Sequence, residues 1–289
     1  MTAHERSRSR PGPRPVQVLA VTSGKGGVGK TNVSVNLACA LADLGQSVLL
    51  LDADLGLANV DVLLDLHPRY HLGHVLAGEV DLEAVILQGP RGVRVVPAAS
   101  GVRRLAALSD AEYAGIIQAF SALEMPLDTL VVDTPAGISD NVAHFCRAAQ
   151  EVLVVVCDEP TSITDAYALV KVLSRDHGIR RFHILVNQAA SVADGREVYR
   201  KLNTVCARFL DVALDLAGVV PHDEYLRRAV QRQRPVVAAY PRSAAAGAFR
   251  RLAREVRGWP VRGEGAGHIA FFFERLIQQQ TPAMAEASL

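Results

Sequence analysis

Apolar residues form short continuous runs along this chain, and most of these runs do not alternate with polar residues. Strands that are apolar throughout are buried on both faces, as in a parallel sheet between two layers of helices. The runs that predict strands lie at 16–23, 47–54, 93–98, 128–134, 151–158, 181–188 and 214–221. Because helical patterns lie between several runs, the chain predicts an α/β domain with a doubly wound, mostly parallel sheet flanked by helices.

Two of the helical patterns, at 32–45 and 162–178, carry signals at their ends. Both finish on a glycine, which commonly follows the last turn of a helix. Ser162 and Asp165 have the spacing of a capping box. The second helix is therefore predicted to begin near Ser162.

The two ends of the chain differ in composition from the predicted domain at 15–258. Residues 1–14 hold four arginines and one glutamate among Ser, Pro and Gly, which is typical of a disordered basic tail. A linker and an amphipathic helix are predicted at 259–280, followed by a second disordered tail at 281–289. The apolar face of that helix is formed by Ile269, Phe272, Phe273, Leu276 and Ile277.

The composition excludes several classes of protein. The chain has 289 residues, of which 49% are hydrophobic, so disordered and fibrous proteins are excluded. A formal net charge of +1 gives no overall field that would favour nucleic acid or a membrane. Four isolated cysteines and no apolar signal segment predict a reduced, cytoplasmic protein.

A glycine-rich loop, SGKGGVGKTN at 23–32, connects the first predicted strand to the first predicted helix. It fits G-x-x-x-x-G-K-[ST] in the strand–loop–helix context of a phosphate-binding loop, whose backbone N–H groups converge on phosphate oxygens. Lys30 is predicted to reach the β- and γ-phosphates, and Thr31 to bind Mg²⁺ through its hydroxyl group. The nucleotide contacts predicted in this loop are Gly24, Lys25, Gly26, Gly27, Val28, Gly29, Lys30, Thr31 and Asn32.

Lysine is rare in this chain, which makes its use in the loop informative. The 31 basic residues are 27 arginines and 4 lysines, and two of the lysines, Lys25 and Lys30, lie in the loop. An ammonium group is a compact point charge that fits inside a ring of backbone amides, whereas guanidinium is planar and bulky. The pair therefore favours phosphate binding over a simple turn.

Acidic residues follow two of the apolar runs. Asp52 and Asp54 end the second predicted strand and lie two residues apart, so they project to the same side. Ligands of open α/β sheets bind at the edge formed by the carboxyl ends of the strands. There one acid would hold Mg²⁺ and the other would orient the attacking water. Asp133 follows an apolar run at 130–132 and is predicted to hold a Mg²⁺-bound water, with 134–137 as a mobile γ-phosphate sensor.

The base of the nucleotide is predicted to be adenine. A Ras-type GTPase would carry N-K-x-D after a late strand. In this chain Asn187 is followed by Gln188 and no aspartate comes next.

The string K-G-G-x-G-K-T at 25–31 resembles the deviant Walker A motif of the MinD/ParA family of dimerising ATPases. The resemblance implies a P-loop NTPase fold and the hydrolysis of ATP with Mg²⁺. It implies that Lys25 reaches across a nucleotide-sandwich dimer to the partner's phosphates and that Asp54 activates the water. The implied catalytic residues are Lys25, Lys30 and Asp54, and the implied magnesium site is Thr31, Asp52 and Asp133. The adenine contacts of the family match Asn187, Pro221, His222 and Asp223.

Longer strings resemble one branch of that family, the flagellar-number regulators FleN and FlhG. They are DLGLANVDVLL at 54–64, DEPTSITDAYAL at 158–169 and GHIAFFFERL at 267–276. This resemblance implies a slow ATPase that switches between monomer and homodimer and restrains a flagellar transcription activator of the enhancer-binding class. It also implies action with an SRP-type flagellar GTPase at the cell pole. The D-Q-A-x-x-L-R segment by which some members activate that GTPase is not found in residues 1–14.

Other functions stay open from the sequence. Nine arginines against three acids at 222–257 would suit a partition ATPase that binds DNA nonspecifically, although no sequence-specific nucleic acid binding is expected. The helix at 268–278 would suit docking on the domain or a peripheral contact with the inner membrane face, as in a MinD-type division-site ATPase. An iron protein would need cysteines that bridge a cluster, but Cys146 and Cys157 are predicted to be core residues. A non-enzymatic interaction protein is disfavoured by Asp54.

Overall fold

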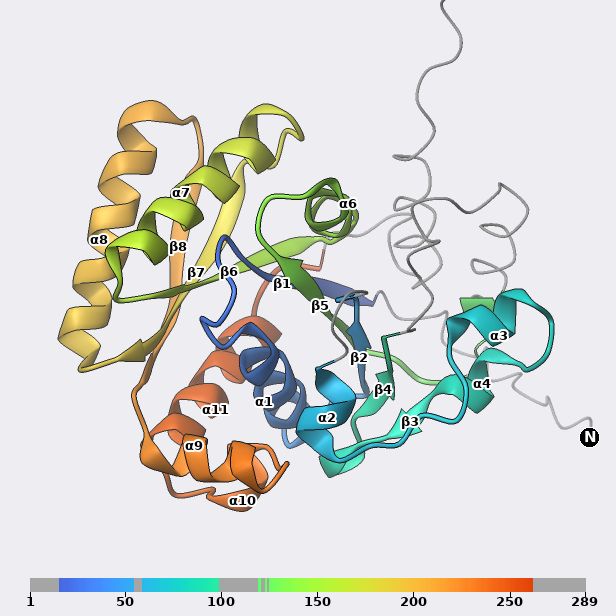
Figure 1. Ribbon diagram of the computed structural model, residues 1–289. Coiled ribbons are helices and arrows are strands. Elements are labelled where there is room, and N and C mark those ends of the chain that lie inside the picture. The colour runs from blue at the N-terminus through green and yellow to red at the C-terminus, as the bar shows by residue number, and fades with distance from the viewer. Residues whose placement is uncertain (1–15, 55–58, 99–118, 121–122, 124, 262–289) are drawn as a thin grey trace, which may run out of the picture.

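The predicted strands form one sheet in the computed structural model, which describes residues 16–261 except 55–58, 99–118, 121–122 and 124 (Figure 1). The strands are β1 (Gln17–Ser23), β2 (Val48–Asp52), β3 (Leu87–Gln88), β4 (Arg94–Val96), β5 (Thr129–Ala136), β6 (Glu151–Cys157), β7 (Arg181–Ala189) and β8 (Ala213–Pro221). In the described residues their order is β3-β4-β2-β5-β1-β6-β7-β8, and only β3 runs antiparallel to its neighbour. The predicted doubly wound, mostly parallel sheet is confirmed.

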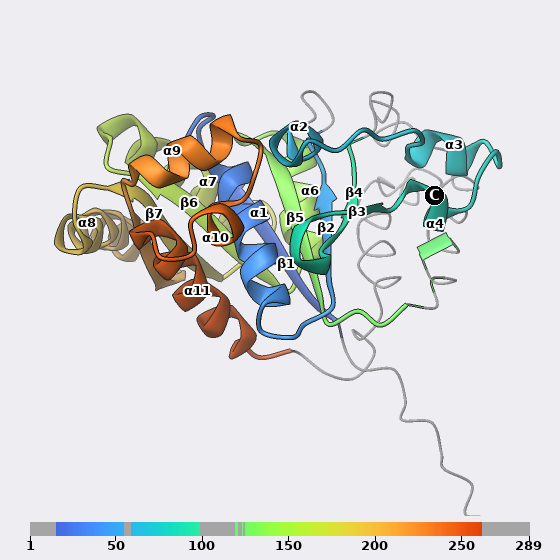
Figure 2. The same cartoon turned by 90° about the horizontal axis from the view of Figure 1, so that it is seen from below.

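Helices cover both faces of the sheet (Figures 1 and 2). Their bounds are α1 (Lys30–Ala42), α2 (Val60–Leu64), α3 (Leu72–Leu76), α4 (Leu82–Val85), α6 (Asp140–Ala148), α7 (Pro160–Arg175), α8 (Val192–Phe209), α9 (Glu224–Gln231), α10 (Val236–Ala239) and α11 (Ala244–Arg257), with a 3₁₀ turn at Pro90–Gly92. One hydrophobic cluster joins the sheet to α6, α7 and α8, and the other joins it to α1, α10 and α11. All seven residues of β1 are buried, as expected for a strand between two layers.

The start of α7 differs from the prediction. The helix begins at Pro160, and the side chain of its N-cap residue Glu159 makes no capping hydrogen bond. Proline is well suited to the first helical position because that residue needs no N–H donor. Ser162 Oγ instead accepts a hydrogen bond from the N–H of Cys157 at 3.0 Å. The predicted capping box between Ser162 and Asp165 is therefore wrong, and Ser162 ties the helix to the end of β6.

The end of α11 is fixed to the edge of the sheet where the strands begin. The ring of Trp259 stacks on His183, with ring centroids 3.6 Å apart and planes at 11°. His183 Nε2 lies 2.8 Å from Glu151 Oε2, and both side chains are buried. Gln17 Nε2 donates a hydrogen bond to the carbonyl of Val256 at 2.9 Å. The chain therefore reaches residue 261 at the edge opposite the glycine-rich loop, which follows the other end of β1.

Several sequence predictions concern residues outside this description. They are the tails at 1–14 and 281–289 and the amphipathic helix at 268–278. Among the residues that the structure describes, none of the helices is long and apolar enough to cross a bilayer.

Candidate nucleotide-binding site

The glycine-rich loop follows β1 at the carboxyl edge of the sheet and leads directly into α1. Gly27 and Gly29 have φ values of +82° and +87°, a region in which a side chain would strain the backbone. Gly24 has another reason to be glycine, because an added Cβ would lie 2.2 Å from the carbonyl oxygen of Asp165 in α7. The close approach of α7 and the left-handed turns therefore require glycine at three points of the loop.

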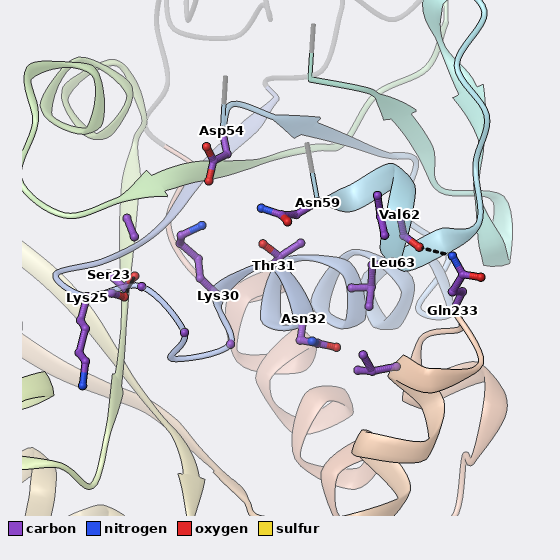
Figure 3. A pocket seen from close by; sticks show the side chains of 15 residues that line it. Ser23, Lys25, Lys30, Thr31, Asn32, Asp54, Asn59, Val62, Leu63 and Gln233 are labelled. Carbon is purple, nitrogen blue, oxygen red and sulfur yellow. Dashed lines mark hydrogen bonds between the residues drawn. The ribbon is translucent and has the colours of Figure 1, made fainter. Parts of the chain in front are cut away.

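A cavity of about 500 Å³ opens over this loop (Figure 3). Of the predicted site residues, those that line it are Lys25, Gly26, Gly27, Gly29, Lys30, Thr31, Asn32 and Asp54. The other lining residues are Ser23, Asn59, Val62, Leu63, Ala136, Val230 and Gln233. The structure therefore brings the loop, the Asp54 segment and the end of α9 around one cavity.

Lys30 and Asp133 form a buried pair beneath the cavity. Lys30 Nζ lies 3.3 Å from Asp133 Oδ1, and Ser34 Oγ donates a hydrogen bond to the same oxygen at 2.9 Å. Burial raises the pKa of Asp133, and the Lys30 ammonium acts against that increase. Asp133 Oδ2 is buried and has no hydrogen-bond partner among the described residues. A buried acceptor without a donor is costly, so this oxygen suits a Mg²⁺-bound water.

The residues around Asp133 fit magnesium held together with a nucleotide. No group of three or more His, Cys, Asp or Glu within the described part of the chain could hold a metal ion. Mg²⁺ does not need such a cage, because it is commonly bound by one or two protein oxygens, several waters and substrate phosphates. The glycine cradle, the Thr31 hydroxyl group and the unpartnered oxygen of Asp133 match that donor set.

Asp52 holds the segment that carries Asp54. The Asp52 carboxylate accepts hydrogen bonds from the N–H groups of Asp54 at 3.0 Å and of Asn59 and Val60 at 3.1 Å each. Asp52 pairs with Asp133 across β2 and β5. Burial raises the pKa of Asp52 to about 7, and the charge of Asp133 adds to the increase. The structure thus gives Asp52 a positioning role, and its predicted role as a magnesium ligand stays a prediction.

Lys25 lies on the other side of the loop from Lys30 (Figure 3). Lys25 Nζ donates hydrogen bonds to Glu159 Oε2 at 2.7 Å and to Thr161 Oγ1 at 3.0 Å, both at the start of α7. The hydrogen bond with Glu159 raises the pKa of Lys25 above its usual value. Lys25 is therefore engaged within its own chain here, and its reach toward a partner's phosphates stays a prediction.

None of the four predicted adenine contacts lines the cavity, and Asn187 contacts the loop. Asn187 Nδ2 donates a hydrogen bond to the carbonyl of Val28 at 2.8 Å, while its buried Oδ1 has no partner among the described residues. Pro221 pairs with Ala189 at the ends of β7 and β8, and the N–H of His222 donates to the Ala189 carbonyl. Asn187 thus supports the loop, and its contact with adenine stays a prediction.

Asp223, the fourth predicted adenine contact, has a structural role in this fold. Its carboxylate accepts hydrogen bonds from the N–H groups of Tyr225 and Ala245 at 2.8 Å each. These bonds join the start of α9 to the start of α11.

Sequence reasoning missed several residues of the site, among them Ser34, Asn59, Glu159 and Gln233. Ser34 lies one helical turn after Lys30, so the helix period could have found it. Glu159 and Gln233 act through long-range contacts. Gln233 has a φ of +50° and donates from Nε2 to the carbonyl of Val62 at 2.7 Å, which joins the end of α9 to α2.

The glycine loop, the buried Lys30–Asp133 pair and the strand order together define a P-loop nucleoside triphosphatase. A family model described as ParA: NUBPL iron-transfer P-loop NTPase matches residues 15–257. The chain belongs to the ParA/MinD family of P-loop NTPases and is an ATPase, which confirms the resemblance of its loop.

Two relatives and one solved structure place the chain within this family. It is 60% identical over 273 residues to the antiactivator FleN of Pseudomonas aeruginosa, covering 94% of this chain and 97% of the relative. It is 35% identical to the flagellum site-determining protein YlxH of Helicobacter pylori, covering 75% and 73%. MinD of Pyrococcus horikoshii, solved with Mg-ADP, superposes with a TM-score of 0.65 at 27% identity and covers 84% of this chain and 96% of that one. The chain therefore binds nucleotide and Mg²⁺.

The cysteines of this chain do not suit iron transfer. Cys39, Cys146, Cys157 and Cys206 are all buried. Burial raises the pKa of Cys39 and Cys146 to about 12, and that of Cys157 and Cys206 to about 11. A cluster shared between subunits needs accessible thiolates, so these side chains do not suit one. Cys146 and Cys157 are core residues, as predicted, and Cys39 and Cys206 are buried as well.

Proposed function

We propose that this protein is an ATP-controlled regulator of flagellar number that restrains a flagellar transcription activator of the enhancer-binding class. The observation that carries the proposal is the 60% identity with the FleN antiactivator over nearly the full length of both chains. The second relative, a flagellum site-determining protein, supports the same process.

The geometry supports ATP hydrolysis by a set of residues with separate tasks. The backbone of 24–30 and the Lys30 ammonium bind the phosphates, while Thr31 and Asp133 hold Mg²⁺ and its water. When bound, Mg²⁺ neutralises part of the phosphate charge. Asp54, at the rim of the cavity, orients the attacking water, and Asp52 keeps the Asp54 backbone in place.

Dimerisation would use the second lysine. In this proposal Lys25 leaves Glu159 and contacts the phosphates bound by a second copy, so the homodimer forms only around ATP. The exposed position of the Lys25–Glu159 pair supports this exchange, because an ion pair in water is readily replaced.

The protein is proposed to act in the cytoplasm and at the cell pole. An SRP-type flagellar GTPase is a second proposed partner, and the segment 268–278, outside the described residues, is proposed to make a peripheral membrane contact. The alternative is a partition ATPase that binds DNA. The exposed arginines of α11, such as Arg251 and Arg254, would suit nonspecific contacts with DNA phosphates rather than sequence-specific binding.

The test is deletion of the gene, followed by counts of flagella per cell and of transcripts under the activator. We expect more flagella and more transcripts, and recovery with the wild-type gene but not with Lys30→Ala. An unchanged flagellar number together with faulty chromosome or plasmid partition would contradict the proposal and favour the alternative.

A further inference from the structure

The short helix α9 has two sides with different chemistry. Leu226 and Val230 are partly buried against the core, and Val230 lines the nucleotide cavity together with Gln233. Tyr225, Arg228 and Arg232 follow one another at helical spacing on the exposed side. Figure 2 shows α9 beside α10 at the outside of the molecule. One side of α9 therefore meets the nucleotide site and the other meets the solvent.

Three exposed side chains of α9 and its C-terminal end form a group with Tyr240, which follows α10 and is half-buried. This group is called here the Tyr–Arg cluster: Tyr225, Arg228, Arg232 and Tyr240. The two tyrosine ring centroids lie 5.0 Å apart. The guanidinium carbon of Arg228 is 5.7 Å from the Tyr225 centroid, and that of Arg232 is 5.5 Å from the Tyr240 centroid. Cation–π contacts of this kind hold long side chains in place without covering them. Tyr225 is 47% exposed, although tyrosine normally buries much of its ring.

The surroundings of the cluster carry a strong positive charge. Residues 222–242, which contain α9, α10 and the turns beside them, hold five arginines against Asp223 and Glu224, in a chain whose net charge is only +1. Glu224 is shared between Arg227 at 2.8 Å and Arg228 at 3.5 Å. The carboxylate of Asp223 is occupied by two backbone N–H groups. The surface is thus complementary to an acidic partner.

Gln233, which directly follows Arg232 of the cluster, is connected to the nucleotide site by a hydrogen bond. Gln233, two residues after α9, donates to the Val62 carbonyl in α2. The first N–H of α2, at Val60, donates to Asp52, whose neighbour across the sheet is Asp133. A partner that docks on α9 therefore contacts an element that lines the cavity and is joined to the Asp52–Asp54 segment.

We propose that the Tyr–Arg cluster is a docking surface for an acidic segment of a protein partner, and that this partner is the transcription activator of the proposed function, on which the proposal rests. Tyrosine and arginine, together with tryptophan, are enriched in the energetic centres of protein interfaces. Guanidinium groups already lie over both tyrosine rings, so the rings do not offer the open faces on which bases stack. Guanidinium groups bind carboxylates in a bidentate manner, which suits an acidic segment.

The test measures the affinity of full-length ATP-loaded protein for the purified flagellar activator of the same organism. The double variant Arg228→Ala/Arg232→Ala removes two charges from the cluster. The matched control, Arg251→Ala/Arg254→Ala, removes two exposed arginines from α11. We expect the cluster variant to bind about tenfold more weakly and the control within about twofold of wild type. Tyr225→Ala keeps the capping N–H and should weaken binding by a similar factor.

ATP turnover and ATP-dependent dimerisation of each variant show that the fold and the nucleotide site are intact. Equal affinities for the cluster variant and wild type would overturn the docking surface while leaving the proposed function in place. Equal losses of affinity in both double variants would mean that binding depends on the overall positive charge, which would also overturn the docking surface. Wild type that binds a single-stranded oligonucleotide of mixed sequence and not the activator would overturn it in favour of nucleic acid. The flagellar count then decides separately whether the proposed function stands.

Discussion

The two lysines of the phosphate loop form ion pairs in opposite surroundings. Lys30 is 7% exposed and lies 3.3 Å from a fully buried Asp133, whereas the Lys25 side chain is 38% exposed and lies 2.7 Å from Glu159. Removing one partner of a buried pair leaves a charge without solvent, at a cost of about 3–5 kcal/mol. An exposed pair loses little, because water replaces the partner. The buried Lys30–Asp133 contact is therefore fixed although it is longer, and the shorter, exposed Lys25–Glu159 contact is suited to exchange.

The largest effect is expected for Lys30→Ala. This change removes the ammonium group from the phosphates and leaves Asp133 buried without its cation. We expect nucleotide affinity to fall by about a hundredfold or more, which a fluorescent ATP analogue can measure by titration. Arg251→Ala is the control for general loss of positive charge. Affinity within a few-fold of wild type for Lys30→Ala would show that the buried lysine does not bind phosphate.

The next effect is expected for Asp54→Ala. Asp54 lines the cavity but is not part of the loop, so ATP binding and the ATP-dependent dimer should remain. Turnover should fall by about a hundredfold, as for the loss of a group that positions or activates water. Phosphate release under saturating ATP is the measurement. Full turnover in this variant would disprove the assignment.

Lys25→Ala tests the exposed ion pair of Lys25 and Glu159. Wild type should change from monomer to dimer with ATP and Mg²⁺ but not with ADP, as followed by light scattering across micromolar concentrations. Lys25→Ala should bind ATP with nearly unchanged affinity and dimerise about tenfold more weakly, because a charge-assisted contact to phosphate is missing. An ATP-loaded wild type that stays monomeric would exclude the switch.

Glu159→Ala should have a smaller effect of opposite sign. Without Glu159, Lys25 no longer has to leave an intrachain partner, so the ATP dimer should form at about twofold lower concentration. The thermal midpoint should be almost unchanged, and added salt should reduce the difference from wild type. A strongly destabilised Glu159→Ala protein would mean that the exposed pair is structural after all.

The last prediction concerns the pH dependence of stability rather than nucleotide binding or dimerisation. With its pKa raised from 3.8 to about 7, Asp52 is protonated in the folded protein at pH values where the unfolded chain has lost this proton. Its contribution to the free energy of unfolding therefore falls as pH rises from about 4 to about 7 and is constant above that range. The thermal midpoints of nucleotide-free Asp52→Asn and wild type should differ by a constant amount due to the altered hydrogen bonds. In addition, the midpoint of Asp52→Asn should rise relative to that of wild type between pH 5 and pH 7.5. A difference that does not depend on pH would contradict this account.

The same contrast between local and distant contacts explains what the sequence could predict. The strands and the phosphate loop depend on short stretches of chain, such as the seven residues of β1 and the glycines that allow left-handed turns. The intrachain partner of Lys25 could not be predicted, because Glu159 is 134 positions away. The helix start at Pro160 was missed because Ser162 bonds to β6 rather than to its own helix.

The site shows the same limit. Asp52 and Asp54 were placed correctly at the carboxyl edge of the sheet, but Asp52 was not expected to hold the backbone of its neighbours. The short helices α2, α3 and α4 have at most five residues, too few for a periodic pattern to be recognised. Gln233 has no motif, and only the fold brings it to Val62.

The stacking of Trp259 on His183 has a practical consequence for spectroscopy. Trp259 is the single tryptophan of the chain, so selective excitation of indole reports on one ring at the end of α11. That ring lies at the opposite edge of the sheet from the phosphate loop, and its emission depends on contact with the imidazole ring. Any ligand or partner that lifts the end of α11 from the sheet should change this emission. The protein thus carries an intrinsic optical probe of the end of α11 that needs no added label.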